Sequence, residues 1–523
     1  MLASAVSTLR PPQQLAAVTV LLALIVLSAC SGPVLKARPN IILIMTDDQR
    51  ADLSALMPTV QRELADKGVS FREAFTTNSL CCPARTSVLR GQYVHNHQVF
   101  SNGGPQGGFP KLYQTGFEGS TIATWLQDAG YRTALMGKYL NAYPHGPSSE
   151  DPPNYRPPRY TYIPPGWTEW FGFFDVPKDL HNDPYVMYGY RVNHNGHVRR
   201  FGNQASDYQT DVLSEQATEF IRRQRRSRSP FFLFLTPTAP HLPTVVAPRH
   251  RGMFEGVRAP RSAAFDEGDM TDKPRWLRTL PQLSDADVSD VDRIYSKQAE
   301  MLLAVDEMVG AILRTLRDTG ELSNTYLVFT SDHGMHMGEH RLSTMKLTPY
   351  AASAHIPLLI RGPGVPEGET PGQLALNIDI APTIAEFAGV TPPGFVDGRS
   401  LAALWSDAPP KWRQTSLMEF WPRSVLDARN VRPTKVRPTN TLVPVPQYRA
   451  VRSKRHLYVE YSYEDGSTEG ELYDLGRDPL ELTNIYSRAD PDLLRAFAKH
   501  AEQLQACAGA RCRELENAPP AGL

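Results

Sequence analysis

Short apolar runs recur along the chain, and most of them are followed directly by polar residues. The run at residues 41–45 is apolar at every position, which is typical of a strand buried on both faces of a parallel sheet. Residues 297–318 carry apolar side chains at the spacing of one helical face, which predicts a helix packed on the core. The other segments interpreted as strands are 131–136, 231–235, 326–330 and 356–360, and those interpreted as helices are 58–67 and 120–129.

This alternation predicts an α/β fold, a three-layer sandwich with a central, mostly parallel mixed sheet, over residues 38–411. Residues 412–523 predict a smaller C-terminal α+β domain with an antiparallel sheet. The elements expected there are strands within 448–463, a turn at 464–467 and a helix near 490–506, and a long loop is expected earlier, at 144–170.

The N-terminal residues 1–30 have the features of an export signal. Residues 15–27 are nearly all apolar but too few for a comfortable membrane span, so they predict a signal-peptide core. The ending Leu-Ser-Ala-Cys at residues 27–30 resembles a bacterial lipobox, which implies cleavage before Cys30 and a lipid on its sulfur that anchors the protein to the membrane. A plain signal peptide with an incidental cysteine is the alternative. Both interpretations predict an exported protein.

Charge and cysteine content narrow the possible partners and sites. The 55 basic residues balance 55 acidic ones, so nothing in the net charge indicates a nucleic-acid partner, and we expect none. Cys507 and Cys512 are close enough in sequence to close a small disulfide loop outside the cytosol. Cys81 and Cys82 are adjacent and lack the two-residue spacer of a zinc pair.

Polar residues follow four of the predicted strands. Asp47 and Asp48 come after the first strand, and Asp332 comes after residues 326–330. Strand-end aspartates often only cap helices. Because the carboxyl ends of parallel strands meet at one edge of a sheet, however, these three carboxylates are candidate ligands for a hard divalent cation. Lys138, His241 and His333 also follow predicted strands.

Several short motifs, in their order along the chain, carry a family resemblance. Cys81 is followed by Pro83 and Arg85, a Cys-x-Pro-x-Arg pattern. The other motifs are Thr46 to Gln49, Gly91 to Val99, Gly137 to Asn141, Pro164 to Trp167, Ala239 to His241, Asp332 to Gly334, Asn377 to Asp379 and Glu471 to Asp474. Together they resemble the sulfatase family of the alkaline-phosphatase-like superfamily, most closely its N-acetylglucosamine-6-sulfatases and extracellular heparan 6-O-endosulfatases.

The resemblance implies a modified nucleophile on a metal ion. Cys81 would be oxidised to formylglycine by a formylglycine-generating enzyme, and the hydrated aldehyde would attack sulfur. One Ca²⁺ per chain would be held by residue 81, Asp47, Asp48, Asp332 and, in place of a common Asn, His333. We expect Ca²⁺ rather than Mg²⁺ because the site would use several protein oxygens and exported proteins meet abundant calcium.

The resemblance also implies roles for cationic residues and for one histidine. Arg85, Lys138 and Lys346 would bind the nucleophile or the sulfate oxygens. His241 would act as the general acid that protonates the leaving oxygen, since histidine titrates near neutrality.

The chain departs from the family pattern at several positions. Leu140 stands where many sulfatases have the histidine that helps release sulfate. Three histidines are alternatives for that base, of which His97 and His336 are expected instead to support the site or contact substrate, and the third is His95. Ala351 to Ser353 replace an acidic position seen in relatives, and Ala84 and Arg90 replace a usual serine and threonine.

These observations predict a sulfuric ester hydrolase that acts on a sulfated carbohydrate, such as a glucosamine 6-sulfate, or on an aryl sulfate. Two alternatives remain open at this point. One is a phosphonate or phosphate ester hydrolase of the same superfamily, and the other is a non-catalytic glycan-binding surface lipoprotein. Residues 422–447 carry five basic side chains and no acidic run, and could form the rim of a cleft for a polyanionic chain.

Overall fold

The computed structural model shows most of the chain after the N-terminal segment. The described residues are 38–144, 156, 158–175, 183–225, 227, 229–406, 410–421 and 444–519. The predicted signal peptide, Cys30 and residues 422–443 lie outside them. Residues 39–523 form one compact unit, and the boundary predicted near residue 412 stays a prediction. Within the described part of the chain, no helix is long and apolar enough to cross a membrane.

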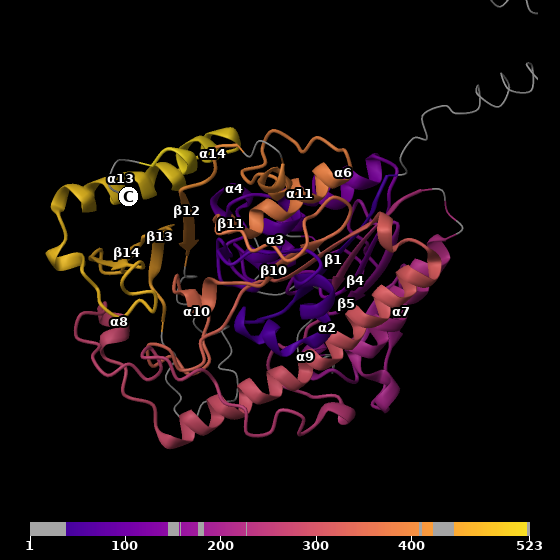
Figure 1. Cartoon of the computed structure of the whole chain (residues 1–523), viewed down its shortest axis with the longest axis horizontal. Helices are drawn as coiled ribbons and strands as arrows, with labels where there is room; N and C mark the ends of the chain where they lie inside the picture. The colour runs from indigo at the N-terminus through magenta and orange to yellow at the C-terminus, as the bar shows by residue number, and fades with distance from the viewer. Residues whose placement is uncertain are drawn as a thin grey trace, which may run out of the picture. The chain divides into compact units, whose positions relative to one another are not determined.

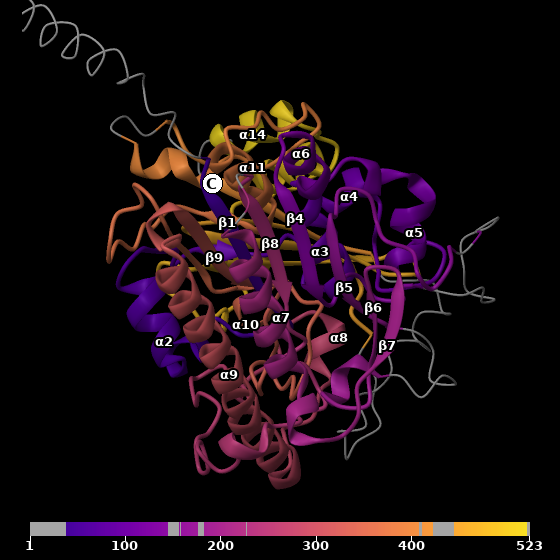
Figure 2. The ribbon, with the colours of Figure 1, turned by 90° about the vertical axis from the view of Figure 1, so that its right-hand side faces the viewer.

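A nine-stranded mixed sheet forms the centre of the molecule (Figures 1 and 2). Its order is β2-β10-β9-β1-β8-β4-β5-β6-β7. The five inner strands from β9 to β5 are parallel, and the outer strands on both sides are antiparallel. The strands are β1 (Asn40–Thr46), β2 (Val69–Ser70), β4 (Arg132–Gly137), β5 (Glu169–Phe173), β6 (Arg191–His194), β7 (His197–Arg200), β8 (Phe231–Thr236), β9 (Thr325–Ser331) and β10 (Leu358–Arg361).

Helices cover both faces of this sheet, as predicted. Every residue of β1 is buried, and successive side chains point to opposite faces. Ile42 and Ile44 therefore join one core cluster, while Ile41 and Leu43 join the other. Helices α7 (Gln209–Gln224) and α9 (Asp285–Thr319) pack on the first, and α3 (Cys81–Arg90), α6 (Ile122–Asp128) and α11 (Ile380–Phe387) on the second (Figures 1 and 2).

Three of the predicted elements differ in the structure: one helix is longer, one helix is divided in two, and one loop ends earlier. The helix predicted at 297–318 begins at Asp285, because Ser284 and Asp287 form a capping box before its apolar stripe starts. The helix predicted at 58–67 comprises α2 (Pro58–Val60) and a π turn, η2 (Gln61–Ala65). The last two residues of the loop predicted at 144–170 already belong to β5.

A second, antiparallel sheet occupies the C-terminal region, again as predicted. It has the order β12-β13-β14-β15, and apolar residues on it join a third core cluster. Helix α14, which follows the predicted final helix, was not anticipated. The elements are β12 (Thr415–Phe420), β13 (Gln447–Ser453), β14 (His456–Ser462), β15 (Thr468–Asp474), α13 (Pro491–Gln505) and α14 (Ala510–Asn517).

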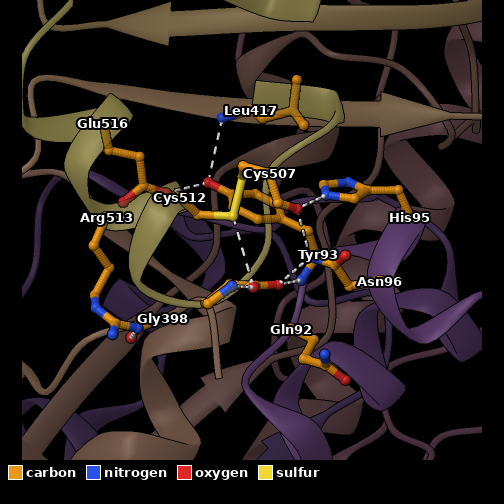
Figure 3. Close-up of a disulfide and its surroundings, with 12 residues drawn as sticks. Gln92, Tyr93, His95, Asn96, Gly398, Leu417, Cys507, Cys512, Arg513 and Glu516 are labelled. Carbon is orange, nitrogen blue, oxygen red and sulfur yellow. Dashed lines mark hydrogen bonds between the residues drawn. A yellow bond between two sulfur atoms is a disulfide. The ribbon is translucent and has the colours of Figure 1, made fainter. Parts of the chain in front are cut away.

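A disulfide between Cys507 and Cys512 forms as predicted and lies where the C-terminal helices meet helix α4 (Val94–His97) (Figure 3). The Cys507 carbonyl accepts hydrogen bonds from His95 Nε2 at 2.9 Å and from Asn96 Nδ2 at 3.0 Å. Because α4 follows α3 after three residues, these bonds tie the C-terminal region to the segment that leads out of α3.

Candidate active site

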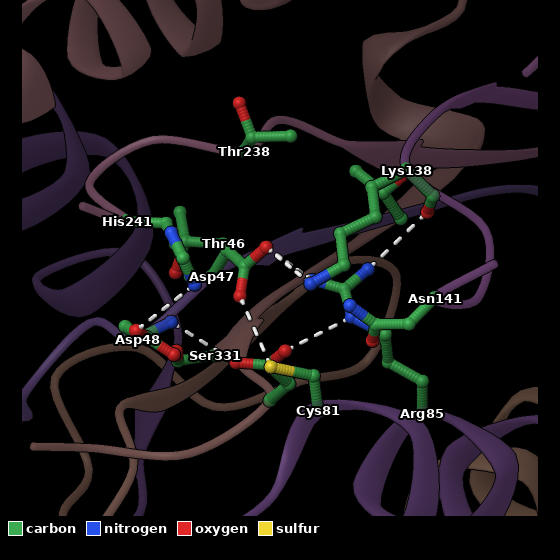
Figure 4. A network of polar contacts seen from close by, with 12 residues as sticks. Thr46, Asp47, Asp48, Cys81, Arg85, Lys138, Asn141, Thr238, His241 and Ser331 are labelled. Carbon is green, nitrogen blue, oxygen red and sulfur yellow. Dashed lines mark hydrogen bonds and ion pairs between the residues drawn. The ribbon is translucent and has the colours of Figure 1, made fainter. Parts of the chain in front are cut away.

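Helix α3 presents Cys81 and Arg85 at the edge where the parallel strands end. Leu80 is extended and occupies the N-cap position, so Cys81 is the first helical residue. Arg85 then lies one turn further along the helix, and its side chain reaches back toward the carboxylates at the strand ends (Figure 4). Both side chains are buried, at 1% exposed. The Cys-x-Pro-x-Arg spacing therefore places a thiol and a guanidinium against the same group of acids.

Asp47 and Asp48 follow β1 and lie close to Cys81. Consecutive side chains on a strand point to opposite faces. Asp48 instead has a φ of 64°, a left-handed conformation that aspartate tolerates better than most residues. Cys81 Sγ lies 3.8 Å from Asp47 Oδ1, and one ligand atom from each of Asp47, Asp48, Cys81 and His241 lies within 4.8 Å of the others.

Asp332 and His333 follow β9, the neighbour of β1. Asp332 Oδ1 accepts the backbone N–H groups of Asp48 and His333, each at 3.0 Å. His333 Nδ1 donates to the Gly334 carbonyl at 2.9 Å. This leaves Nε2 facing the site, 3.4 Å from Cys81 Sγ and 3.4 Å from Asp48 Oδ1. The structure thus brings all the predicted metal ligands together.

Two lysines are paired with the carboxylates. Lys138 Nζ lies 2.6 Å from Asp47 Oδ2. Lys346 Nζ lies 2.8 Å from Asp48 Oδ1 and 3.3 Å from Cys81 Sγ. Lys138 follows the end of β4 directly, whereas Lys346 comes from a loop far along the chain. Both predicted lysines therefore converge on the same site.

Arg85 uses only part of its hydrogen-bonding capacity. Its Nε donates to Asp332 Oδ2 at 2.9 Å, and Nη1 donates to the Lys138 carbonyl at 3.2 Å. Nη2 is buried with no hydrogen-bond partner among the described residues, and it lies 3.5 Å from Asp47 Oδ2. A buried guanidinium nitrogen that makes no hydrogen bond can donate one to an oxygen of a bound anion.

The charges of these groups reinforce one another. Burial acts to raise the pKa of Asp47, but Lys138 and then Arg85 hold it well below its usual range. Burial likewise opposes ionisation of Asp48, yet Lys346 and other cations lower its pKa to about 2. In turn, the carboxylates overcome the effect of burial and raise the pKa of Lys138 and of Lys346. At neutral pH these carboxylates are ionised and both lysines are protonated.

His241 follows β8, and its ring is oriented by contacts of both nitrogens. Its Nδ1 donates to the Leu242 carbonyl, so Nε2 faces Asp48 Oδ2 at 3.5 Å (Figure 4). Burial is the main cause that lowers the pKa of His241. His333 differs: burial lowers its pKa, but Asp332 and other acids raise it to about 9.

The donor set fits a divalent cation. Three carboxylates, the imidazoles of His241 and His333 and residue 81 form two overlapping groups of ligand atoms that share residue 81. Oxygen-rich sets of this kind suit Ca²⁺ or Mg²⁺. The two lysines neutralise the carboxylates and would lie beside an ion bound there.

The three histidines considered as alternative bases have partners elsewhere. His95 bonds Glu419, His97 bonds Ser87 and His336 bonds Thr348. None of the hydrogen bonds or ion pairs among the described residues links them to Cys81. Leu140, at the position of the usual histidine, is buried in the core and has no titratable group.

Sequence reasoning assigned no role to three other residues beside the site. Tyr185, Asp175 and Asn141 contact one another and line the side near His241 and Lys138. Asn141 belongs to the motif that begins at Gly137, so the sequence did point to its neighbourhood. No local pattern distinguishes Tyr185 or Asp175.

Comparison with known proteins agrees with this geometry. Residues 39–390 match the family described as Sulfatase, and residues 338–507 match the C-terminal region of N-sulphoglucosamine sulphohydrolase. The human N-acetylglucosamine-6-sulfatase is 32% identical over 534 residues, which cover 96% of this chain and 91% of that protein. The solved structure of BT4656 with its substrate D-glucosamine-2-N,6-O-disulfate has a TM-score of 0.68 at 23% identity and covers 93% of this chain and 100% of that one, which shows a shared fold.

Another similar protein is much longer than this chain. The extracellular sulfatase SULF-1 homolog of Drosophila melanogaster is 37% identical over 398 residues, which are 74% of this chain but 33% of that protein. The chain therefore spans about a third of the length of that relative. The family match extends over most of the chain, from before β1 to beyond α11. The chain belongs to the sulfatase family.

Proposed function

We propose that this protein hydrolyses sulfate monoesters at the site around residue 81. The observation that carries the proposal is the position of Cys81 Sγ, which is 3.3 Å from Lys346 Nζ, 3.4 Å from His333 Nε2 and 3.8 Å from Asp47 Oδ1. A nucleophile derived from this thiol would lie among cations that can bind sulfate oxygens. This arrangement suits transfer of a charged sulfuryl group.

Cys81, and not Cys82, is the residue we expect to be converted to formylglycine. Only Cys81 has the proline and arginine at the required offsets, and only its sulfur faces the acidic group. Cys82 Sγ instead accepts the Asn141 backbone N–H at 3.0 Å, and burial raises the pKa of its thiol. Formylglycine supplies a hydrated aldehyde, in which one hydroxyl can attack sulfur and the other can later expel sulfate.

Asp47, Asp48, Asp332 and His333, with residue 81, would hold one Ca²⁺. The ion would supply positive charge for the sulfate oxygens and for the nucleophile. Lys138 and Lys346 carry charge that does not depend on the ion. Arg85 Nη2, which lies 3.5 Å from Asp47 Oδ2 and has no hydrogen-bond partner among the described residues, can donate to an oxygen of the hydrate or of the sulfate.

His241 is the candidate general acid. Its Nδ1–H donates to the Leu242 carbonyl, so Nε2 carries a proton for the leaving oxygen only in the imidazolium form, which burial disfavours and the Asp48 and Asp47 carboxylates favour. A sugar alkoxide needs that proton more than an activated phenolate does, because it is the more basic leaving group. Proton transfer of this kind typically contributes ~100- to 10,000-fold in rate.

A sulfated carbohydrate such as a glucosamine 6-sulfate is the proposed natural substrate, in view of the names of the similar proteins. An aryl sulfate would serve as an artificial one. Maturation would require a formylglycine-generating enzyme. Export and a lipid on Cys30 remain proposals from the N-terminal sequence, as does a polyanion-binding role for residues 422–447.

Paired cysteine variants test the proposal. Protein from the native host, wild type, Cys81→Ala and Cys82→Ala, would be assayed on 4-nitrophenyl sulfate and N-acetylglucosamine 6-sulfate. We expect Cys81→Ala to lose nearly all activity and Cys82→Ala to retain much more, because only the first removes the nucleophile. Intact-mass analysis of the wild type should detect conversion of one thiol to an aldehyde.

Other outcomes identify the alternatives. Full activity in Cys81→Ala would refute the nucleophile. Faster turnover of 4-nitrophenyl phosphate or of a matched phosphonate ester than of the sulfate would favour a phosphonate or phosphate ester hydrolase. An unmodified Cys81 together with glycan binding and no turnover would favour a surface lipoprotein that only binds.

A further inference from the structure

A tyrosine with no role in the proposed reaction lies against the candidate general acid. The ring of Tyr185 packs on the ring of His241, with centroids 4.2 Å apart and planes inclined by 31°. On the same ring, Lys138 Nζ lies 5.2 Å from the centroid. Tyr185 therefore connects the residue proposed to protonate the leaving group with a residue proposed to bind sulfate.

The hydroxyl of Tyr185 is held by two polar neighbours. It donates to Asp175 Oδ2 at 3.3 Å and accepts from Asn141 Nδ2 at 3.1 Å. Asn141 Nδ2 also donates to the same Asp175 oxygen, at 3.0 Å. Three side chains from three segments thus form a closed triangle of hydrogen bonds, which fixes the tyrosine ring at its far end.

Asn141 gives this triangle a particular place in the chain. It directly follows Leu140, where the family pattern has a titratable histidine. The side-chain amide of Asn141 cannot act as a base at neutral pH. Asn141 makes two contacts beside the site: its backbone N–H donates to Cys82 Sγ, and its side chain donates to the Tyr185 hydroxyl. The segment after Lys138 therefore supports the walls of the site.

His241 has few other restraints on its ring. The described polar contacts are Nδ1 with the Leu242 carbonyl and Nε2 with Asp48 at 3.5 Å. A contact in the ring plane does not prevent the ring from tilting out of that plane. The Tyr185 ring covers one face and blocks tilting toward that side. The side chain of His241 stays 17% exposed, so a leaving group can still reach it.

From this geometry we infer that Tyr185, held by Asn141 and Asp175, is a positioning residue that aligns His241 Nε2 with the leaving-group oxygen. The inference rests on the proposed sulfatase function. It attributes to Tyr185 an effect that depends on the leaving group, since correct placement of an acid matters only where the departing oxygen needs a proton. Misplacement of a catalytic group by about 1 Å can cost ~100-fold in rate.

The test compares two sulfate esters across a set of variants. The esters are N-acetylglucosamine 6-sulfate, with a basic alkoxide leaving group, and 4-nitrophenyl sulfate, with a stable phenolate. We expect Tyr185→Leu to lower kcat/KM about 100-fold for the sugar ester but only about threefold for the aryl ester. His241→Ala should show the same selective loss, at least as large. Tyr185→Phe keeps the ring but loses the hydrogen bonds that hold it, so it should show a smaller loss that again falls mainly on the sugar ester.

A matched control separates positioning from general damage. Tyr190 is fully buried against Phe173 and Phe201 on another part of the sheet. Tyr190→Leu should therefore affect both esters equally, in proportion to the fraction of folded protein measured by circular dichroism.

The outcomes distinguish this inference from the function on which it rests. Equal losses on both esters in Tyr185→Leu, or wild-type activity on the sugar ester, would overturn the positioning role while leaving the sulfatase proposal intact. If Tyr185→Leu does not fold, unequal losses in Tyr185→Phe support the inference and wild-type behaviour in that variant overturns it. A modified wild-type protein that turns over neither ester would overturn both.

Discussion

Arg85 and Arg413 are both fully buried, yet their surroundings differ. Arg413 satisfies all three guanidinium nitrogens with carboxylates: Nε bonds Glu516 at 2.9 Å, while Nη1 and Nη2 bond the two oxygens of Asp379 at 2.5 and 2.9 Å. Arg85 bonds one carboxylate and one carbonyl and keeps Nη2 without a hydrogen-bond partner among the described residues. The side chain of Arg413 is 0% exposed and that of Arg85 is 1% exposed.

This contrast shows that burial of charge does not by itself identify an active site. The Arg413 group is closed: Glu516 also binds Tyr93 and Arg399, near the disulfide (Figure 3). Arg413 itself has no donor left for a ligand, and it joins the segment before β12 to Asp379 and to Glu516 of α14. The Arg85 group combines an unused donor with a nucleophilic position and with side chains that remain partly exposed.

Loss of Arg413 should give the largest change in stability. Arg413→Met leaves Asp379 and Glu516 without their shared cation, and breaking a buried ion pair by removing one partner typically costs ~3–5 kcal/mol. We therefore expect a loss of about that size in the free energy of unfolding, measured in urea, with kcat/KM per folded molecule nearly unchanged. A large loss of turnover in the folded fraction would contradict the structural role.

The same substitution at Arg85 should act mainly on turnover. Removing one donor to a developing oxyanion typically lowers the rate ~100- to 1000-fold, so we expect Arg85→Met to lower kcat/KM for 4-nitrophenyl sulfate by about that factor. The unfolding free energy should fall less than in Arg413→Met, because Asp47 keeps its ion pair with Lys138 after the substitution. If Arg85→Met instead unfolds the protein with little effect on folded turnover, the contrast drawn from the unused Nη2 is wrong.

A smaller change in the free energy of unfolding is expected when the pH is raised, because of His95 near the disulfide. The partial burial of His95 lowers its pKa, but Glu419 raises it to about 9 from an ordinary value of 6.5. A histidine whose pKa is higher in the folded state stabilises the protein fully below pH 6.5, and the stabilisation is lost as the pH rises through 9. We expect wild type to lose about 1–2 kcal/mol of unfolding free energy between pH 7 and pH 9.

The matched variant for this measurement is His95→Gln, which removes the titrating group while keeping a polar side chain. Its stability should be lower than that of wild type at pH 7 and should change less between pH 7 and pH 9. Parallel curves for the two proteins would show that His95 does not carry the dependence.

Much of the fold followed from local patterns. The fully apolar run at 41–45 became a central strand, and the stripe at 297–318 lies within α9. The sequence at the start of α9 and in the hairpin β6–β7 is polar and has no periodic pattern of apolar residues. The sequence analysis therefore did not predict the first residues of α9 or these two strands. They form because capping and pairing with a neighbouring strand compensate for weak local signals.

The sequence by itself determined which residues could meet at the site. Parallel strands end at one edge, so the sequence predicted that Asp47 and Asp332 meet there, and the family resemblance added Lys138 and His241. The spacing from Cys81 to Arg85 is one helical turn. Only the tertiary structure decided that Arg85 Nη2 has no hydrogen-bond partner among the described residues, that all three nitrogens of Arg413 are bonded, and that Tyr185 covers His241. These outcomes depend on how loops from distant segments pack together, and no periodic pattern within a single segment encodes that packing.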